Sequence, residues 1–151
     1  MNEKRISNIE LSALADGLLE AGCIKFGEFT LKSGLKSPIY IDLRYIISFP
    51  KLLEQIGAAY LPLLETLQFS RIAGLPYAAI PIATAVSLQG NYPMIYPRKE
   101  AKTYGTKAEI EGEYHAGETV VVIDDLATTG DDVGAGLDAR HGQVSPAAEA
   151  G

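Results

Sequence analysis

The segment VVVIDDLATTG, residues 120–130, places two carboxylates directly after an apolar run. Carboxylates accept hydrogen bonds from sugar hydroxyls and bind Mg²⁺ directly or through water. Neighbouring residues of a strand point to opposite faces, but Asp124 and Asp125 stand where the run ends, so both side chains can turn toward one ligand. The segment therefore predicts a site for a polyhydroxylated ligand at the end of a buried strand.

The residues that follow the carboxylates are suited to a phosphate. Residues 127–130, Ala-Thr-Thr-Gly, offer successive backbone N–H groups and two hydroxyls, and a helix starting beyond them would add its positive end. The Gly-Lys-Ser/Thr ending of the phosphate loop in nucleotide hydrolases is absent. A phosphorylated sugar fits the whole segment, and the alternative is that Asp125 or Thr128 only caps a helix.

A second chemically active segment is YPRKEAKTYGTKAEIEGEYHAGE, residues 96–118. It is long, charged and marked by glycines, and such connections in compact domains are usually functional or disordered. It carries four of the 13 basic residues, which are Arg98, Lys99, Lys102 and Lys107. These cations can neutralise a diphosphate, and the alternative is a solvated charged hairpin. Residues 98–115 are expected to form a mobile loop with few contacts.

Composition limits the other possibilities. A chain of 151 residues with 47% apolar content supports one globular domain. The single cysteine, Cys23, excludes an internal disulfide, and His115 and His141 lack the neighbours that a metal site needs. The net charge of −6 argues against nucleic-acid binding. No apolar run reaches membrane length and the first ten residues are too polar for a signal peptide, so a cytoplasmic protein is expected.

The helices and strands that position these groups are predicted from the spacing of apolar residues and from the residues that start or end helices and strands. Helices are predicted over 7–22, 50–67 and 81–90. Ser7 or Asn8 can cap the first helix, and Pro62 should bend or interrupt the second. Strands are predicted over 28–34, 37–43, 71–75, 93–96 and 120–125. Apolar strands alternating with helices predict an α/β fold, a parallel sheet with helices on each side. Ligands bind such sheets at the carboxyl ends of the strands, so the carboxylates and the loops after 71–75 and 93–96 should share one rim.

The chain resembles a known family through four segments that occur in the family's order. VVVIDDLATTG resembles the ribose-phosphate signature of the type I phosphoribosyltransferases. EFTLKSGLKSPIYIDLR, AGLPYAAIPIAT and YPRKEAKTYGTKAEIEG are similar to the orotate phosphoribosyltransferases, in the version that is fused in UMP synthase. The resemblance covers roughly residues 5–130. It implies a central parallel sheet flanked by helices and a pentosyl transfer to orotate in pyrimidine biosynthesis.

The resemblance also implies roles for individual residues. Asp124 and Asp125 would bind the ribose hydroxyls of phosphoribosyl diphosphate, and Lys102 would act in the active site of the neighbouring subunit. The remaining positions implied to bind phosphoribosyl diphosphate are Arg98, Lys99, Tyr104, Tyr77, Ala78, Leu126, Ala127, Thr128, Thr129, Gly130 and Asp131. The positions implied to contact orotate are Lys32, Tyr40, Ile41 and Thr128. The enteric bacterial version has lysine at the position of Ala78 and histidine at that of Tyr104.

The implied chemistry agrees with the residue types. Diphosphate leaves the anomeric carbon while positive charge develops on the ribose ring, and Mg²⁺, held mainly by the diphosphate, assists together with the basic loop. The implied partners are orotate, phosphoribosyl diphosphate and a second copy of the chain in a homodimer. The alternative is a non-catalytic sensor of phosphoribosyl diphosphate with the same fold, which the basic loop argues against because a sensor needs no clamp on a leaving group.

The resemblance stops after Gly130. Residues 131–151, DDVGAGLDARHGQVSPAAEAG, hold five alanines and four glycines but no Lys, Ile, Tyr or Phe, and they show no strand-like run. Asp131 places a carboxylate beside the phosphate loop, and no arginine matches the one that contacts orotate in the family. The expected organisation is therefore an incomplete phosphoribosyltransferase domain over 1–130 and an aberrant, poorly ordered tail over 131–151, with reduced activity.

Overall fold

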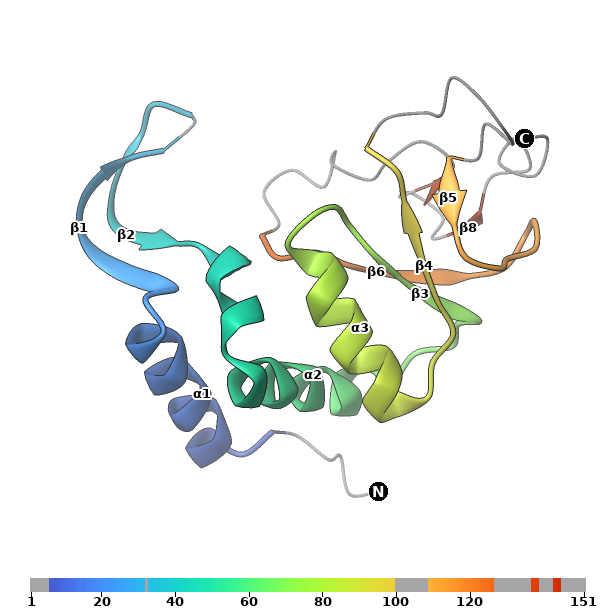
Figure 1. The fold of residues 1–151 in the computed structure, drawn as a ribbon, viewed down its shortest axis with the longest axis horizontal. Helices are drawn as coiled ribbons and strands as arrows, with labels where there is room; N and C mark the ends of the chain where they lie inside the picture. Colours follow the sequence, from blue (N-terminus) through green and yellow to red (C-terminus); the bar gives the residue numbers. More distant parts are fainter. Residues whose placement is uncertain (1–5, 32, 100–108, 127–136, 139–142, 145–151) are drawn as a thin grey trace.

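A computed structural model describes residues 6–31, 33–99, 109–126, 137–138 and 143–144 (Figure 1). Its elements, in chain order, are α1 (Asn8–Glu20), β1 (Ile24–Thr30), β2 (Lys36–Ile41), the 3₁₀ helix η1 (Leu43–Ser48), α2 (Pro50–Leu64), β3 (Arg71–Gly74), α3 (Ala79–Gly90), β4 (Met94–Pro97), β5 (Ile110–Glu111), β6 (Val120–Ile123), β7 (Leu137–Asp138) and β8 (Gln143–Val144). The chain is an α/β protein, as its sequence predicts. None of the described helices is long and apolar enough to cross a membrane.

The central sheet has the strand order β5-β4-β3-β6. β3 pairs in parallel with β4 and with β6, and β5 returns antiparallel to β4. In the described residues β6 is therefore the last strand on its side of the sheet, although Val120 and Ile123 on it are buried, as expected for the strand that ends in the carboxylates. The parallel register still brings the carboxyl ends of β3, β4 and β6 to one edge.

The main core lies between one face of this sheet and the helices. Side chains from α2, α3, β3 and β6 meet there, including Ile56, Ile82, Ile72 and Ile123. A smaller cluster on the opposite face contains Ala73, Ile95, Ile110 and Val120. The described α-helices all contribute to the main core or pack beside it (Figure 1). The helices expected on the second face are not found among the described residues.

The helix boundaries follow local chemistry. Ser7 caps α1 in a reciprocal arrangement with Glu10, in which each side chain accepts the other residue's backbone N–H. α2 begins at Pro50, which suits the first turn because proline lacks only an N–H that would have no helical partner. Of the two effects expected for Pro62, interruption is wrong, because α2 continues through Pro62 to Leu64 and loses only the backbone donor of that one residue.

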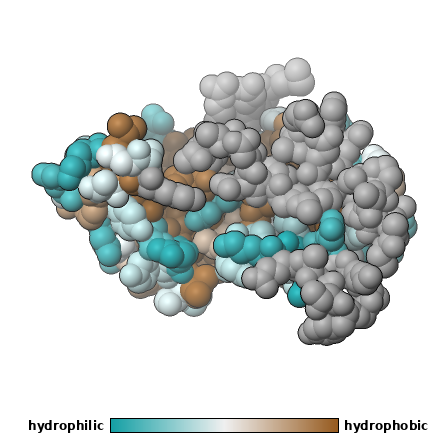
Figure 2. All heavy atoms as spheres, turned by 90° about the horizontal axis from the view of Figure 1, so that it is seen from above, coloured by the Kyte–Doolittle hydropathy of each residue, from teal (hydrophilic) through white to brown (hydrophobic). Residues whose placement is uncertain are grey.

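The chain between α1 and α2 forms a hairpin that stands apart from the sheet (Figure 1). β1 and β2 pair antiparallel, with an irregular register between Phe26 and Phe29. Hydrophobic side chains remain exposed on it, and Phe26 is 70% exposed. Brown spheres accordingly lie among teal ones on the surface at this end of the molecule (Figure 2). The sequence predicts two strands around a turn, but β1 lies over Ile24–Thr30 rather than 28–34, since Gly34 lies in the turn. The 3₁₀ helix η1, which follows β2, is not predicted.

Two further sequence expectations change. Residues 109–112 were expected to belong to a loop with few contacts, but Ile110 is 2% exposed and β5 pairs with β4. An apolar side chain on a strand edge can join the core even inside a charged segment. The expectation of no strand in the tail is also wrong, because β7 and β8 pair in a short antiparallel ladder.

Candidate active site

The candidate site is built at the carboxyl ends of β3 and β6. Gly74 pairs with Ile123 in the parallel register, and the Leu75 backbone N–H donates to the Ile123 carbonyl at 3.0 Å. This bond ties the first residue of the β3–α3 loop to the residue that precedes Asp124. The two expected components, a carboxylate pair and the loop after β3, therefore lie side by side, as the sequence predicts.

A close approach between β3 and α3 shapes the loop between them. A side-chain carbon at Gly74 would lie 2.8 Å from the Ala83 β-carbon and 3.1 Å from the Ala79 carbonyl oxygen. Glycine is therefore needed for the helix to pack this tightly on the strand. The first turn of α3 receives no side-chain cap from Ala78. Tyr77 and Ala78, both predicted to be ligand contacts, thus sit between the strand end and an uncapped helix start.

The carboxylate pair carries an unfavourable concentration of negative charge. The Asp125 backbone N–H donates to the Asp124 Oδ1 atom at 2.8 Å, and both side chains are partly buried. Burial raises the pKa of Asp125 above its usual value, and the hydrogen bond and charge of Asp124 raise it further. Ligand hydroxyls or a cation near the pair would reduce this repulsion.

Two residues that the sequence analysis did not select influence this pair. Tyr60 of α2 has a raised pKa, first because it is buried and then because of the charges of Asp124 and Asp125. Asp42 also contributes to the raised pKa of Asp125. Tyr60 stands one helical turn from both Ile56 and Leu64, which are buried, and this spacing was the available signal that it faces inward.

Asp42 is held in place by Arg44. Its carboxylate is 9% exposed and accepts from the Arg44 Nε and Nη2 atoms at 2.7 and 2.6 Å. The same carboxylate caps η1 by accepting the Arg44 backbone N–H at 3.1 Å. The hydrogen bonds from Arg44 lower the pKa of Asp42, so it remains charged near Asp125. An aspartate two residues before an arginine at a strand end was the sequence signal for this cap.

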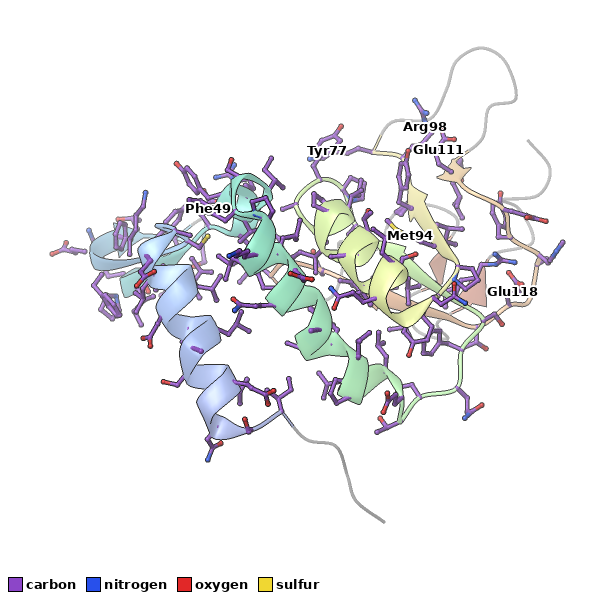
Figure 3. All side chains as sticks on the ribbon, turned by 60° about the horizontal axis from the view of Figure 1, so that its bottom comes forward. Phe49, Tyr77, Met94, Arg98, Glu111 and Glu118 are labelled. Atoms are coloured by element: carbon purple, nitrogen blue, oxygen red, sulfur yellow. The ribbon has the colours of Figure 1, made fainter. Side chains whose placement is uncertain are left out.

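The basic side of the site begins where β4 ends. The Arg98 backbone N–H donates to the Glu109 carbonyl at 2.7 Å, and the Arg98 side chain forms an ion pair with Glu111 of β5. Tyr77, Arg98 and Glu111 lie along the same side of the molecule (Figure 3). A cavity of about 270 Å³ lies here, and it is lined by Pro76, Tyr77, Ile80, Tyr96, Pro97, Arg98 and Lys99.

Tyr40 and Ile41, the predicted orotate contacts on the hairpin, lie on opposite faces of β2. Tyr40 and Ile41 are consecutive residues of β2, so their side chains point to opposite faces of the hairpin. Tyr40 packs against Phe29, with ring centroids 5.4 Å apart, while Ile41 is paired with Ile24. The two side chains therefore cannot both contact one small ligand from the same face. β2 leads directly into Asp42, which brings the base of the hairpin toward the carboxylate pair.

The other predicted site residues lie outside the described part of the chain. They are Lys32, Lys102, Tyr104, Ala127, Thr128, Thr129, Gly130 and Asp131. Leu126 is described and exposed, at the point where the chain leaves the carboxylates. The described residues thus contain the strand-end carboxylates, the β3–α3 loop and the beginning of the basic segment.

Comparison with known proteins gives a consistent set of relatives. The chain is 42% identical over 122 residues to the orotate phosphoribosyltransferase of Methanocaldococcus jannaschii, covering 81% of this chain and 69% of that protein. Its structure is similar to that of Leishmania donovani UMP synthase, with a TM-score of 0.71 and 52% identity, covering 79% of this chain and 26% of the other. It is also similar to Mycobacterium tuberculosis orotate phosphoribosyltransferase in complex with 5-phospho-α-D-ribosyl 1-diphosphate, with a TM-score of 0.59 and 27% identity over 82% of this chain and 69% of that one.

The chain is shorter than many of these relatives. It spans between 25% and 66% of the length of four further curated relatives, all of which are orotate phosphoribosyltransferases or fused enzymes. No family model matches the chain. The similarity therefore rests on agreement in sequence and fold over 81% and 79% of this chain, respectively.

Proposed function

Because this chain belongs to the orotate phosphoribosyltransferase family, we propose that it transfers the phosphoribosyl group from phosphoribosyl diphosphate to orotate. The products are orotidine 5′-monophosphate and diphosphate, and the reaction is a pentosyl transfer of pyrimidine biosynthesis. The observation that carries this proposal is the rim on which Asp124 and Asp125 lie beside the β3–α3 loop, with the start of the basic segment at the end of β4.

The acidic side of the rim suits the ribose. Asp124 and Asp125 accept hydrogen bonds from the ribose hydroxyls, and their negative charge favours the cationic ring that develops as the anomeric bond breaks. Residues 127–131, which follow directly, hold the 5′-phosphate through backbone N–H groups and the hydroxyls of Thr128 and Thr129. The pKa of Asp125 is raised first by burial and then by Asp124, so hydrogen bonds from ribose hydroxyls would stabilise the ionised pair, which supports its role in binding the ribose.

The basic side of the rim suits the diphosphate. Arg98, Lys99, Tyr77 and Ala78 surround or adjoin the cavity between the ends of β3 and β4. Lys102 and Tyr104 follow in the same segment, and we assign Lys102 to the active site of a second copy in a homodimer. On the orotate side, Lys32, Thr128 and one of Tyr40 and Ile41 contact the base.

The proposed cofactor is Mg²⁺, held mainly by the diphosphate of the substrate. Among the described residues, no group of three or more His, Cys, Asp or Glu side chains is arranged to hold a metal ion. The two carboxylates supply oxygen atoms, the donor type that Mg²⁺ prefers, at the edge where diphosphate would lie. When bound, Mg²⁺ supplies charge neutralisation of the leaving diphosphate.

The division of the chain also remains a proposal. We assign residues 1–130 to an incomplete phosphoribosyltransferase domain and 131–151 to an aberrant tail that adds no catalytic group, since its single arginine, Arg140, matches no family motif. Asp131 weakens the phosphate site by placing a like charge beside it. The cytoplasmic location expected from the sequence stays a prediction.

The direct test is formation of orotidine 5′-monophosphate by the purified chain with orotate, phosphoribosyl diphosphate and Mg²⁺, measured chromatographically. Uracil in place of orotate is the control, because it lacks the carboxylate. We expect product with orotate but not with uracil as the acceptor. The Asp124→Asn variant should not form this product. Transfer to uracil but not orotate would refute the substrate, whereas binding of phosphoribosyl diphosphate without any transfer would favour a sensor.

A further inference from the structure

One side chain on the diphosphate side of the rim has no structural reason for its position. Tyr77 is 69% exposed, although it stands in the short loop between the buried strand β3 and the buried start of α3. Its ring lies beneath the Lys99 ammonium, with the Nζ atom 5.1 Å from the ring centroid. An aromatic face attracts a cation within about 6 Å of its centroid. The exposed ring therefore holds a cation from a different strand end.

Lys99 differs in its surroundings from its neighbour Arg98. Arg98 is anchored twice, by its backbone bond to Glu109 and by its ion pair with Glu111. In the part of the chain that the structure describes, no carboxylate forms an ion pair with Lys99. The residue before Lys99 is thus fixed to the sheet, while the Lys99 ammonium is held by an aromatic ring.

This difference has a chemical consequence. A carboxylate partner would neutralise the ammonium and compete with an incoming anion. An aromatic face attracts the cation through its quadrupole and adds no negative charge, and the ammonium keeps N–H donors for other acceptors. Both residues line the cavity at the ends of β3 and β4. The arrangement orders a positive charge at the cavity and leaves that charge available.

We propose that Tyr77 is a positioning residue for Lys99, whose ammonium it holds over the cavity so that it can receive the diphosphate group of the ligand. The inference rests on the proposed function for the nature of the ligand, but the contact itself does not. It also places a positive charge beside the β3–α3 loop, which has Ala78 where the enteric bacterial version has lysine. Because the aromatic ring and not the hydroxyl makes the contact, Tyr77→Phe should preserve the position of Lys99 and Tyr77→Leu should not.

The first experiment tests the contact without any ligand. Lysines of the full-length chain are ¹³C-methylated, which preserves their charge, and the Lys99 signal is assigned with Lys99→Arg. We expect a ring-current shift of this signal in the wild type and in Tyr77→Phe, and its loss in Tyr77→Leu. Tyr45→Leu is the matched control, because Tyr45 makes a similar contact with Lys25 at 5.4 Å on the hairpin. An unchanged Lys99 signal in Tyr77→Leu would overturn the inference.

The second experiment tests the consequence, with inorganic diphosphate as the probe in calorimetric titrations. Tyr77→Leu should weaken binding about two- to fivefold, the range for an exposed cation–π contact, while Tyr77→Phe and Tyr45→Leu should bind like the wild type. Lys99→Ala should weaken binding more, and Tyr77→Leu should add little to it. Equal binding by Tyr77→Leu and wild type would overturn the positioning role and leave the proposed function intact. No binding by the wild type would overturn both.

Discussion

The two ends of the β3–β6 ladder hold charges in opposite ways. At the carboxyl end, Asp124 and Asp125 stand together, and the pKa of Asp125 is raised by burial and by its neighbour. At the amino end, Arg71 and Glu118 form a partly buried ion pair, and its hydrogen bonds lower the pKa of Glu118 to about 2. One end of the ladder holds two like charges directly after β6, and the other holds an ion pair between Arg71 of β3 and Glu118, which precedes β6.

This difference separates binding from stability within one sheet. Like charges that are held together destabilise the fold unless a ligand compensates them, so they indicate a site. Opposite charges in hydrogen-bond contact complete the fold and leave nothing for a ligand. The Arg71–Glu118 pair is reinforced by the Ser70 backbone N–H, which donates to the Thr119 carbonyl at 2.8 Å, and by the His115 N–H, which donates to Glu118 at 3.0 Å. Variants at the carboxyl end should therefore change chemistry, and variants at the amino end should change stability.

The largest effect is expected for Lys102→Ala. If Lys102 stabilises charge that develops on the leaving diphosphate, its loss should lower kcat by about 10²–10³-fold with a much smaller change in KM. Lys51→Ala is the control, because Lys51 is an exposed lysine at the start of α2. Steady-state kinetics of orotidine 5′-monophosphate formation measure both constants. An unchanged kcat would show that the assigned role is wrong.

A smaller effect is expected for Asp125→Asn. Loss of a charged acceptor should weaken phosphoribosyl diphosphate binding by about 10- to 100-fold, since a hydrogen bond to a charged group contributes roughly 1.5–3 kcal/mol. The same substitution removes a repelled charge, so the melting temperature at pH 7 should not fall. Calorimetry with Asp16→Asn as an exposed control separates the two effects. Weaker binding together with a clearly lower melting temperature would mean that Asp125 is structural.

The pH dependence of Asp125 has a definite sign. Its folded-state pKa is raised, so its ionisation destabilises the fold as pH rises through the unfolded and then the folded pKa. Ligand binding through the ionised carboxylate should instead strengthen as pH rises through the raised pKa. The affinity of wild type for phosphoribosyl diphosphate, measured across this range beside Asp125→Asn, should show a dependence that the variant lacks. Identical pH profiles would contradict the assignment.

The sequence predicted the carboxyl end of the ladder better than the amino end. Val120–Ile123 is a continuous apolar run, and Asp124 and Asp125 end it, so a local pattern was sufficient. The Arg71–Glu118 pair joins residues 47 positions apart, and no local pattern indicates it. For Asp42 and Tyr60 a local pattern indicates the helix cap and the inward-facing position, but not their electrostatic influence on the carboxylates, which depends on the tertiary fold.

The hairpin and the basic segment show a second limit. The residue types at Tyr40 and Ile41 were read from a resemblance, but strand alternation places them on opposite faces. Ile110 was assigned to a loop because its neighbours are charged, yet one apolar side chain with an available strand edge joins the core. Elements that pack against a large apolar core were predictable from periodicity. The two-residue strands β5, β7 and β8 were not, because such short segments carry no periodicity and form only by pairing with a neighbour.

At the amino end, Glu118→Gln should destabilise the fold and leave binding unchanged. The lowered pKa means that Glu118 contributes stability above the unfolded-state value of 4.5, and that this contribution is lost as pH falls toward about 2. The melting temperature of Glu118→Gln should therefore be lower than that of wild type at pH 7, and the two should converge at low pH. Glu20→Gln, at an exposed position at the end of α1, is the control, because Glu113 is close enough for its charge to act on Arg71. A difference that kept its full size as the pH fell from 4.5 to about 2 would show that the charge is not its source.

The smallest effect is expected for Asp131→Ser, and it extends the comparison to the residues after the carboxylates. Asp131 adds a third acidic group in a segment that is proposed to hold the 5′-phosphate, where it repels the ligand. A like charge near an exposed phosphate costs about 1 kcal/mol, so the substitution should strengthen phosphoribosyl diphosphate binding roughly fivefold.

Binding of ribose 5-phosphate and of inorganic diphosphate, measured separately, shows where this gain in affinity arises. Asp131→Ser should improve binding of ribose 5-phosphate and leave that of diphosphate unchanged, because only the former reaches the 5′-phosphate site. Asp132→Ser is the matched control one position further along the chain. Equal gains for both ligands would mean that Asp131 acts through the general acidity of the rim, and the 5′-phosphate would then have to be placed elsewhere.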